Sequence, residues 1–276
     1  MHIGIITCEI LRAEIRAVIA KTGITTVFIV LSETNNPVIC VLNKEVTRRF
    51  LHNLAKDGIE IKIKEKTFER IVKEIREDNI TDSLIIKVME LRMHDYPDKL
   101  LAEIEEGLTN LSAVADIVLL GYGLCGNSAK AIERVIQEAK VPVAIPRDEE
   151  GLILNNCIEI ALGKTKVKSL LREEIGTFFM TPAGASIIKE PQVILESSIN
   201  IIAGQMTRNA RMDTEKIIKI LKSHYKRVVK ICYSEADDKD GEYRETIENF
   251  ARKFGLKIKT ETGSSEIMLD ALQRVS

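Results

Sequence analysis

The sequence lacks several features that would assign it to a specialised class of protein. It has no tryptophan, and aromatic residues make up only 4% of its 276 residues. Lysine and arginine (40) are balanced by aspartate and glutamate (41), so the clustered positive charge that binds nucleic acid is missing. No apolar run approaches the roughly 18 residues of a membrane span, and no basic, apolar leader precedes the first expected strand. These absences predict a cytoplasmic protein that binds neither nucleic acid nor a membrane.

Hydrophobic residues make up 45% of the chain, which is enough for a packed core. Short apolar runs alternate with segments of helical spacing almost throughout. Such alternation predicts an α/β fold with one or more mainly parallel, Rossmann-like sheets and helices on both faces. We expect an N-terminal α/β lobe over residues 1–185 and a C-terminal α/β portion over residues 186–276 that packs on it. The runs typical of strands include 3–7, 59–63, 83–91, 116–120 and 141–146.

The five cysteines form neither a disulfide framework nor a compact metal motif. Their number is odd, and no two of them form a CxxC pair. Cys40 lies between apolar neighbours and Cys232 ends an apolar strand, so both are interpreted as core residues. Any metal site must therefore be assembled from distant segments of the chain.

Four metal-competent side chains follow expected strands or the loops after them. In open parallel sheets, functional groups gather at the carboxyl ends of the strands, so we expect these four to meet there. Three thiolates and one imidazole form a Cys3His zinc site, and a nearby helix N-terminus is expected to lower the pKa of a thiol. Alternatively, the cysteines are core residues and the histidine lies at the surface or caps a helix. The four residues are Cys8, His94, Cys125 and Cys157.

The segment GYGLCGN, residues 121–127, admits two interpretations. Its glycines match G-x-G-x-x-G between a strand and a helix, which is the context of a dinucleotide-binding turn. However, the strand is not the first of its domain, and no acid ends the next strand about 20 residues further on. The turn is better explained as one that presents Cys125, with backbone amides available to an anionic substrate. The predicted substrate-binding residues of the turn are Gly121, Tyr122, Gly123, Gly126 and Asn127.

Two further residues are candidates for substrate binding. Arg147 follows a strand and can hold an anionic group through two hydrogen bonds, although a salt bridge to one of the three acids after it is an alternative. Thr181 begins the segment TPAG after another expected strand. It would shape a ligand loop, and an ordinary turn is the alternative.

Several short motifs occur in a recognisable order along the chain. They are ITCEILRAEI, LRMHDYPDKL, LLGYGLCGN, a Pro-Arg pair, NNCIEIALG and GTFFMTP. On these motifs, and on the C-terminal segment YSEADDKDGEYRETIENFARKFGLKIKTETGSSEIML, the sequence resembles the domain of unknown function 1638 family of methanogenic archaea and anaerobic bacteria. The resemblance covers most of the chain, and GYGLCG is its most specific element.

The resemblance implies a set of site residues and a kind of partner. Asn155 and Asn156 stand where the family carries histidine and aspartate, so that pair has no counterpart here. Some relatives lie beside genes for corrinoid-dependent methyltransferases, which implies one-carbon metabolism and a corrinoid protein or methyltransferase as partner. The family cysteines and histidine fall at Cys8, His94, Cys125 and Cys157.

These observations predict a metal-dependent enzyme, of the transferase or lyase type, that acts on a small anionic, thiol or methyl-group substrate. Its cofactor would be Zn²⁺ in the Cys3His site. A [4Fe–4S] enzyme with three cysteine ligands and an open iron uses the same residues. A non-enzymatic small-ligand or corrinoid-protein accessory module is the third interpretation. The sequence assigns no catalytic residue and is compatible with a homo-oligomer.

Overall fold

The structure, a computed structural model, describes residues 1–31, 47, 50, 62–188 and 223–275. Cys40, which was interpreted as a core residue, lies outside the described residues. The chain forms two compact units, one made of Met1–Ala161 with Ser265–Ser276 and the other of Leu162–Ser264. The lobe boundary expected at residues 185 and 186 falls inside a helix, α8 (Pro182–Ile188).

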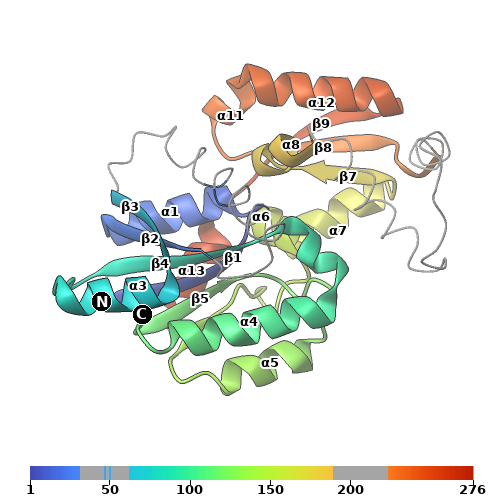
Figure 1. The fold of residues 1–276 in the computed structure, drawn as a ribbon. Helices are drawn as coiled ribbons and strands as arrows, with labels where there is room; N and C mark the ends of the chain where they lie inside the picture. Colours follow the sequence, from blue (N-terminus) through green and yellow to red (C-terminus); the bar gives the residue numbers. More distant parts are fainter. Residues whose placement is uncertain (32–46, 48–49, 51–61, 189–222, 276) are drawn as a thin grey trace, which may run out of the picture. The chain divides into compact units, whose positions relative to one another are not determined.

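The first unit is built on a six-stranded sheet in the described part of the chain (Figure 1). Its strand order is β3-β2-β4-β1-β5-β6, and every pairing is parallel. The predicted α/β fold with a mainly parallel, Rossmann-like sheet is therefore confirmed. The strands are β1 (His2–Cys8), β2 (Thr26–Leu31), β3 (Lys62–Thr67), β4 (Ser83–Met89), β5 (Ile117–Gly121) and β6 (Val143–Ala144).

Helices cover both faces of this sheet, as predicted. Alternate residues of a strand point to opposite faces. Gly4 of β1 faces Leu111 of α4, whereas Ile3 and Ile5 belong to the core on the other face, under α1 and α13. The helices of this unit are α1 (Arg12–Thr22), α3 (Phe68–Glu77), the 3-10 helix η1 (Leu91–Asp95), α4 (Pro97–Leu111), α5 (Ala129–Gln137), α6 (Cys157–Leu162) and α13 (Glu266–Gln273).

Two expected strands differ from the observed ones. The strand expected at 141–146 is reduced to β6, because Pro142 and Pro146 flank it and proline has no N–H to donate to a ladder. The strand expected at 59–63 begins outside the described residues, and β3 continues beyond residue 63 to Thr67. Lys64 and Lys66 of β3 pair with Glu74 of α3, which begins at Phe68.

The carboxyl ends of β1 and β5 form the point at which the sheet changes winding direction. β1 leads into α1 on one face, whereas β5 leads into α5, which packs beside α4 on the other face (Figure 1). Neighbouring strands whose connections leave on opposite faces create a crevice at their carboxyl ends, and ligands of α/β proteins bind there. The fold therefore places its most favourable binding position after Cys8 and Gly121.

The second unit is a small α/β structure with its own core. Its sheet has the order β7-β8-β9, all parallel. The hydroxyl of Tyr243 donates to the carbonyls of Met180 and Ile231 and so ties a helix to two strands. The segment 181–184, expected as a turn, starts a helix. The elements are α7 (Lys164–Glu173), β7 (Thr177–Met180), α8, β8 (Arg227–Cys232), α11 (Glu235–Lys239), α12 (Gly241–Phe254) and β9 (Lys257–Thr262).

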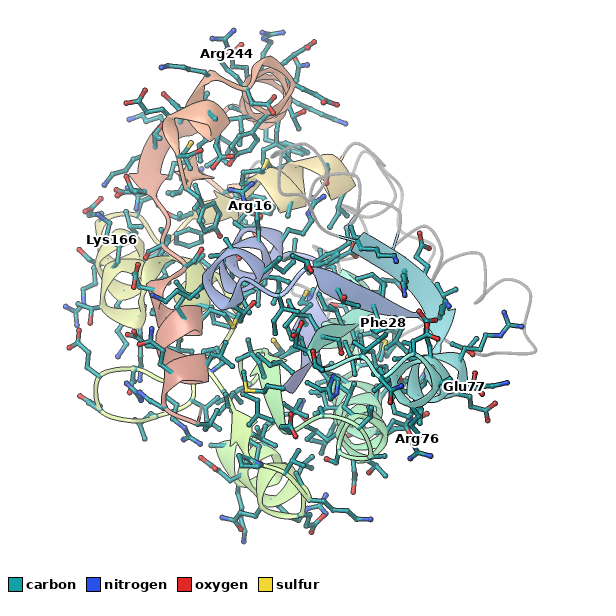
Figure 2. The ribbon with its side chains drawn as sticks, turned by 90° about the vertical axis from the view of Figure 1, so that its left-hand side faces the viewer. Arg16, Phe28, Arg76, Glu77, Lys166 and Arg244 are labelled. Carbon is teal, nitrogen blue, oxygen red and sulfur yellow. The ribbon has the colours of Figure 1, made fainter. Side chains whose placement is uncertain are left out.

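Many charged side chains lie on the outside of the two units, as Figure 2 shows for Arg76 and Glu77 of α3 and for Arg244 of α12. Phe28 of β2 is instead fully buried. Among the helices within the described ranges, none has both the length and the apolar character needed to cross a membrane.

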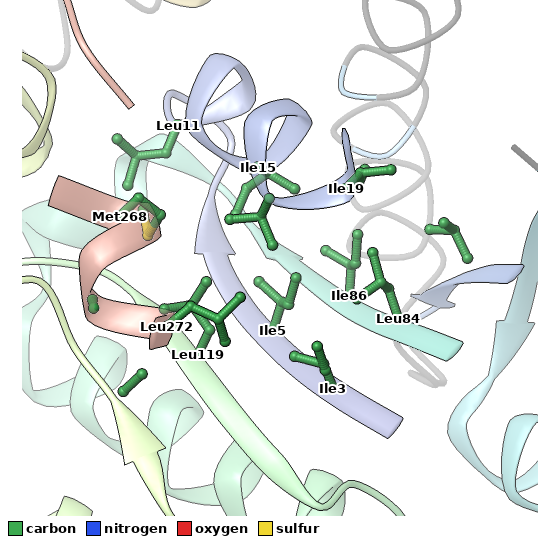
Figure 3. Packing of buried hydrophobic residues seen from close by; sticks show 14 of the residues in the cluster. Ile3, Ile5, Leu11, Ile15, Ile19, Leu84, Ile86, Leu119, Met268 and Leu272 are labelled. Carbon is green, nitrogen blue, oxygen red and sulfur yellow. The ribbon is translucent and has the colours of Figure 1, made fainter. Parts of the chain in front are cut away.

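The C-terminal helix α13 completes the core of the first unit. Met268 and Leu272 pack in one cluster with Leu11 at the N-cap of α1, with Ile15 of α1 and with Leu119 of β5, and Figure 3 shows both projecting toward α1 and the sheet. Residues from the two ends of the chain therefore share one hydrophobic core.

Met268→Ala is expected to destabilise the first unit by roughly 2–5 kcal/mol, because the side chain is fully buried and leaves a cavity. Urea unfolding followed by circular dichroism measures the change. Gln273→Ala, at an exposed position of the same helix, is the matched control and should change stability by no more than about 0.5 kcal/mol. Equal effects of the two substitutions would contradict the proposed packing of α13.

Candidate functional site

Three cysteines from separate segments lie at the carboxyl edge of the first sheet. Cys8 is the last residue of β1, Cys125 lies in the turn after β5, and Cys157 is the first residue of α6. Cys8 is only 5% exposed, and Cys157 packs against the central core cluster. The structure thus places one cysteine at the end of a strand, one in the turn after a strand and one at the start of a helix.

Strand register brings the first cysteine beside the glycine-containing turn. Thr7 of β1 pairs with Gly121, the last residue of β5, so Cys8 and Tyr122 are the residues that follow this pair. A Cβ atom on Gly121 would lie 3.0 Å from the hydroxyl oxygen of Thr7. The absence of a side chain at Gly121 allows this tight approach.

The same turn is joined by backbone hydrogen bonds to the segment that carries Cys157. The amides of Leu124 and Cys125 donate to the carbonyls of Leu154 and Asn155, each at 2.8 Å. A Cβ on Gly123 would lie 2.6 Å from both the Leu154 carbonyl oxygen and the Asn156 amide nitrogen. Glycine is therefore required at position 123, and the close approach fixes the Cys125 segment next to the Cys157 segment.

Cys125 itself adopts an unusual backbone conformation. Its φ is +44°, in the left-handed region that non-glycine residues rarely occupy. Residues held in this region cluster at functional sites, where the surrounding structure imposes the conformation. The structure therefore keeps a cysteine at a position where glycine would fit the backbone better.

Burial raises the pKa of all three thiols. The pKa of Cys125 rises to about 11, and the pKa of Cys157 is raised further by the neighbouring Cys8, Cys125 and Glu14. Desolvation also raises the pKa of Cys8. Cys125 also raises the pKa of Cys8, so charge on one thiol acts on its neighbours in this buried region.

The expectation that a helix N-terminus lowers these pKa values is wrong. Helix α1 begins at Arg12 and α5 at Ala129, so Cys8 and Cys125 both precede the helices by several residues. The effect of a helix dipole is confined to its first turn, and at Cys157, the first residue of α6, burial outweighs that effect and raises the pKa.

Tyr122 lies among the three thiols with its hydroxyl unsatisfied. The residue is 2% exposed, and the hydroxyl oxygen is buried without a hydrogen-bond partner of ordinary geometry. Burial raises the pKa of Tyr122, and the neighbouring Cys8, Cys125 and Cys157 raise it further. A buried polar group left without a partner costs about 1–3 kcal/mol, so such a group in a native site indicates a missing interaction.

Glu14 is a member of this neighbourhood that sequence reasoning missed. It is fully buried in α1, and its carboxylate acts on the pKa of Cys157. The signal was present in the sequence, because position 14 lies on the same helical face as the buried Leu11, Ile15 and Val18. A glutamate on an otherwise apolar face is a candidate functional group.

His94 lies in η1, on the segment that precedes α4. Its Nδ1 hydrogen-bonds to the carbonyl of Leu91, and its Nε2 lies 3.2 Å from Oδ1 of Asp95. Both ring nitrogens of His94 therefore contact groups of the same short segment. Metal binding through Nε2 would require the contact with Asp95 to be given up.

The side chains are not arranged around a metal position in this conformation. Among the described residues, no three histidine, cysteine, aspartate or glutamate side chains stand in an arrangement that could hold a metal ion. Cysteine side chains occupy alternative staggered rotamers, so the sulfurs of Cys8, Cys125 and Cys157 would have to rotate to share one metal.

Asn155 and Asn156, which precede Cys157, have local structural roles. The side chain of Asn156 accepts from the amides of Ile158 and Glu159 and so caps α6. The amide group of Asn155 donates to the buried carboxylate of Glu159, at 3.0 Å to each oxygen. Both contacts fix the backbone that leads into Cys157.

Several backbone amides of the turn are already hydrogen-bonded within the protein and are not available to an anion. In addition to the amides of Leu124 and Cys125, the amide of Tyr122 donates to the carbonyl of Leu120 and that of Asn127 donates to the carbonyl of Leu124. A Cβ on Gly126 would lie 2.9 Å from Pro97, so this glycine packs against the start of α4. The amide nitrogen of the Asn127 side chain is buried without a hydrogen-bond partner.

The other two predicted substrate-binding residues have structural partners. Nη1 of Arg147 lies 2.7 Å from the carboxylate of Glu133 in α5 and 3.0 Å from the carbonyl of Gly151. The salt bridge expected with an adjacent acid is thus made with a residue of α5. Thr181 lies in the second unit, where its hydroxyl accepts from the amide of Gly184 and caps α8.

Gly123→Ala should destabilise the first unit by roughly 1–3 kcal/mol, because the added methyl group overlaps the backbone of residues 154–156. We also expect Cys125 and Cys157 to react faster with a thiol reagent. Denaturant unfolding and thiol titration provide the measurements. Gly241→Ala, where an added Cβ meets nothing within 4 Å, is the control and should leave both properties unchanged.

The backbone conformation of Cys125 predicts that glycine is a more stable replacement there than alanine, the reverse of the order expected within a helix. Cys125→Gly should be more stable than Cys125→Ala by about 1 kcal/mol, because only glycine adopts a positive φ without strain. At Cys157, which is helical, alanine should instead be the more stable replacement. Thermal unfolding of the four variants measures both differences in stability. If the alanine variant were the more stable one at both positions, the backbone at Cys125 would not be strained.

Comparison with known proteins identifies the family. Residues 88–272 match the family described as Protein of unknown function (DUF1638). The matched segment contains His94, Cys125 and Cys157, whereas Cys8 precedes it. No curated protein matches the chain. The match extends over more than half of the sequence and confirms the resemblance predicted from the motifs. The chain therefore belongs to the DUF1638 family.

Proposed function

We propose that this protein is a metal-dependent enzyme whose metal is bound by the thiolates of Cys8, Cys125 and Cys157. One observation supports the proposal above the others. Three cysteines from separate segments share a buried neighbourhood at the winding switch of a parallel sheet, beside the unsatisfied hydroxyl of Tyr122. Inert core cysteines have no reason to gather at this edge.

The raised pKa values favour a metal site over a free cysteine nucleophile. At neutral pH the three thiols are protonated, because burial holds their pKa values well above the usual range. A thiol of that kind is a poor nucleophile. A divalent cation deprotonates its cysteine ligands, so metal binding would make thiolates where burial alone prevents them.

The engaged ring of His94 supports a three-cysteine site rather than a closed Cys3His site. Three protein ligands and one open position are typical of catalytic zinc, whereas structural zinc has four protein ligands. With three thiolate ligands, zinc would bind a substrate thiol at the open position as its thiolate, the form that accepts an alkyl group. His94, paired with Asp95, is then available as an acid–base group.

The substrate class that fits this arrangement is a small thiol or methyl-group compound. The turn amides and Arg147, which would have favoured an anion, are used in contacts within the protein. A corrinoid protein or a methyltransferase, as the family resemblance implies, would be a suitable partner for such chemistry. We propose that the protein acts in the cytoplasm.

A [4Fe–4S] cluster is the second candidate for the same residues. Three cysteines with no free fourth protein ligand also suit a cluster with one open iron. Zinc and the iron–sulfur cluster differ in metal content and colour, so analysis of one purified sample distinguishes the two candidates.

The test is metal analysis after anaerobic purification. We expect about one zinc per chain in the wild-type protein, as a single three-cysteine site requires. Cys8→Ala, Cys125→Ala and Cys157→Ala should each lose most of this zinc. Cys232→Ala, which changes a buried cysteine of the second unit, should retain it.

Other results would change or remove the proposal. A brown protein with about four iron atoms per chain and broad absorbance near roughly 400 nm would replace zinc by the cluster. Full metal content in Cys125→Ala would contradict both metal sites. Stoichiometric metal with no turnover of thiol or methyl substrates would instead indicate the non-enzymatic binding module.

A further inference from the structure

The small sheet of the second unit has one edge strand that is open to solvent. β9 lies at the end of the order β7-β8-β9, and within the described ranges no strand except β8 pairs with it. Ile258, Thr260 and Thr262 of β9 are exposed, Ile258 to 46%. Edge strands can pair with a strand of another chain, so many are protected by a proline or a bulge. β9 contains neither, because its sequence lacks proline and its ladder with β8 is continuous.

The backbone groups that point away from the sheet belong to alternate residues of β9. The amides of Lys257 and Gly263 donate to the carbonyls of Lys226 and Cys232, at 3.0 and 2.9 Å, so the odd-numbered residues face β8. Successive residues of a strand direct their backbone groups to opposite sides. The three exposed, even-numbered residues therefore present their N–H and C=O groups to a further strand.

We propose that β9 pairs antiparallel with β9 of a second copy of this chain, about a twofold axis at Thr260. In this register the two copies of Thr260 lie opposite each other, and Ile258 lies opposite Thr262 of the second copy. Lys259 then lies opposite Glu261 of the second copy, once on each side of the axis. Such a pair is of the non-hydrogen-bonded kind, in which the side chains approach more closely. The two three-stranded sheets become one continuous sheet.

Charge selects this register over the neighbouring ones. An axis at Lys259 would place this lysine opposite its own copy, and an axis at Glu261 would do the same with the glutamate. An axis at Ile258 would place Lys257 opposite Lys259. Like charges directly opposite each other destabilise a strand pair, whereas opposite charges stabilise it. The axis at Thr260 is the one that sets the positive residue at the centre of β9 against the negative one.

Both faces of β9 suit this contact. Lys259 lies 2.8 Å from Glu173 of α7, and Glu261 lies 2.7 Å from Lys166 of the same helix, so both charges are held in place before the copies meet. The opposite face presents the three exposed residues, all of them β-branched and therefore favourable in strands. Six residues from each copy form a small interface beside the roughly 20–30 of a standard one, so the dimer is weak and reversible.

Sedimentation equilibrium of the full chain at roughly 10–500 µM tests the proposal, because a small interface requires high concentration. We expect the wild-type chain to show a monomer–dimer equilibrium. Thr260→Pro should raise the dimer Kd at least about tenfold, since proline removes the outward N–H at the axis and no hydrogen bond to β8. Thr260→Ala keeps this N–H and should change the Kd by less than about threefold. Circular dichroism establishes that both variants are folded.

Charge reversal decides the question if Thr260→Pro does not fold. Lys259→Glu and Glu261→Lys should each raise the Kd at least about fivefold, because each sets like charges opposite each other on both sides of the axis. The double variant should return to within about threefold of the wild-type Kd, because opposite charges face each other again. The double exchange does not restore the ion pairs with Glu173 and Lys166, so pairing between copies is what predicts this recovery.

Two results would overturn the proposal. The first is a wild-type chain that stays monomeric at roughly 500 µM, which would leave this edge to a strand of a different protein. The second is a dimer whose Kd changes neither in Thr260→Pro nor in the single charge variants, because its contact then lies elsewhere. The cysteines of the first unit take no part in these measurements, so the proposed function is tested separately.

Discussion

Two backbone hydrogen bonds, from Leu124 and Cys125 to the carbonyls of Leu154 and Asn155, hold the candidate site together. They are possible because Gly123 has no side chain to separate the two segments. The bonds fix the turn after β5 to the entrance of α6, and the ladder between β1 and β5 supplies Cys8. The cysteine positions therefore depend on main-chain geometry, which is more rigid than side-chain packing.

The site combines groups that a protein interior normally avoids. Three thiols, a carboxylate and a hydroxyl lie where water has little access, and one cysteine holds a positive φ. Local strain and unsatisfied polar groups reduce stability, so they persist where another requirement retains them. The raised pKa values indicate that the three sulfurs are uncharged at neutral pH.

Much of the fold follows from local sequence signals. The apolar run 3–7 and its successors predict the buried strands, Gly23 ends α1 in a left-handed conformation, and Pro97 opens α4. These signals act within a few residues, so one sequence suffices to detect them. The thiol pKa values and the partner of Arg147 depend instead on burial and on contacts between distant segments, which spacing does not contain. The buried Glu14 was detectable, because its helical face was otherwise apolar.

The route of the chain has a consequence for synthesis on the ribosome. The first unit consists of residues 1–161 and 265–276, so its last helix emerges only after the whole second unit. Until then, the surface that Met268 and Leu272 cover on α1 and β5 is left exposed in the nascent chain. Exposed apolar surface of this kind attracts chaperones and favours aggregation. The unit that carries Cys8, Cys125 and Cys157 is completed by the last helix of the described chain.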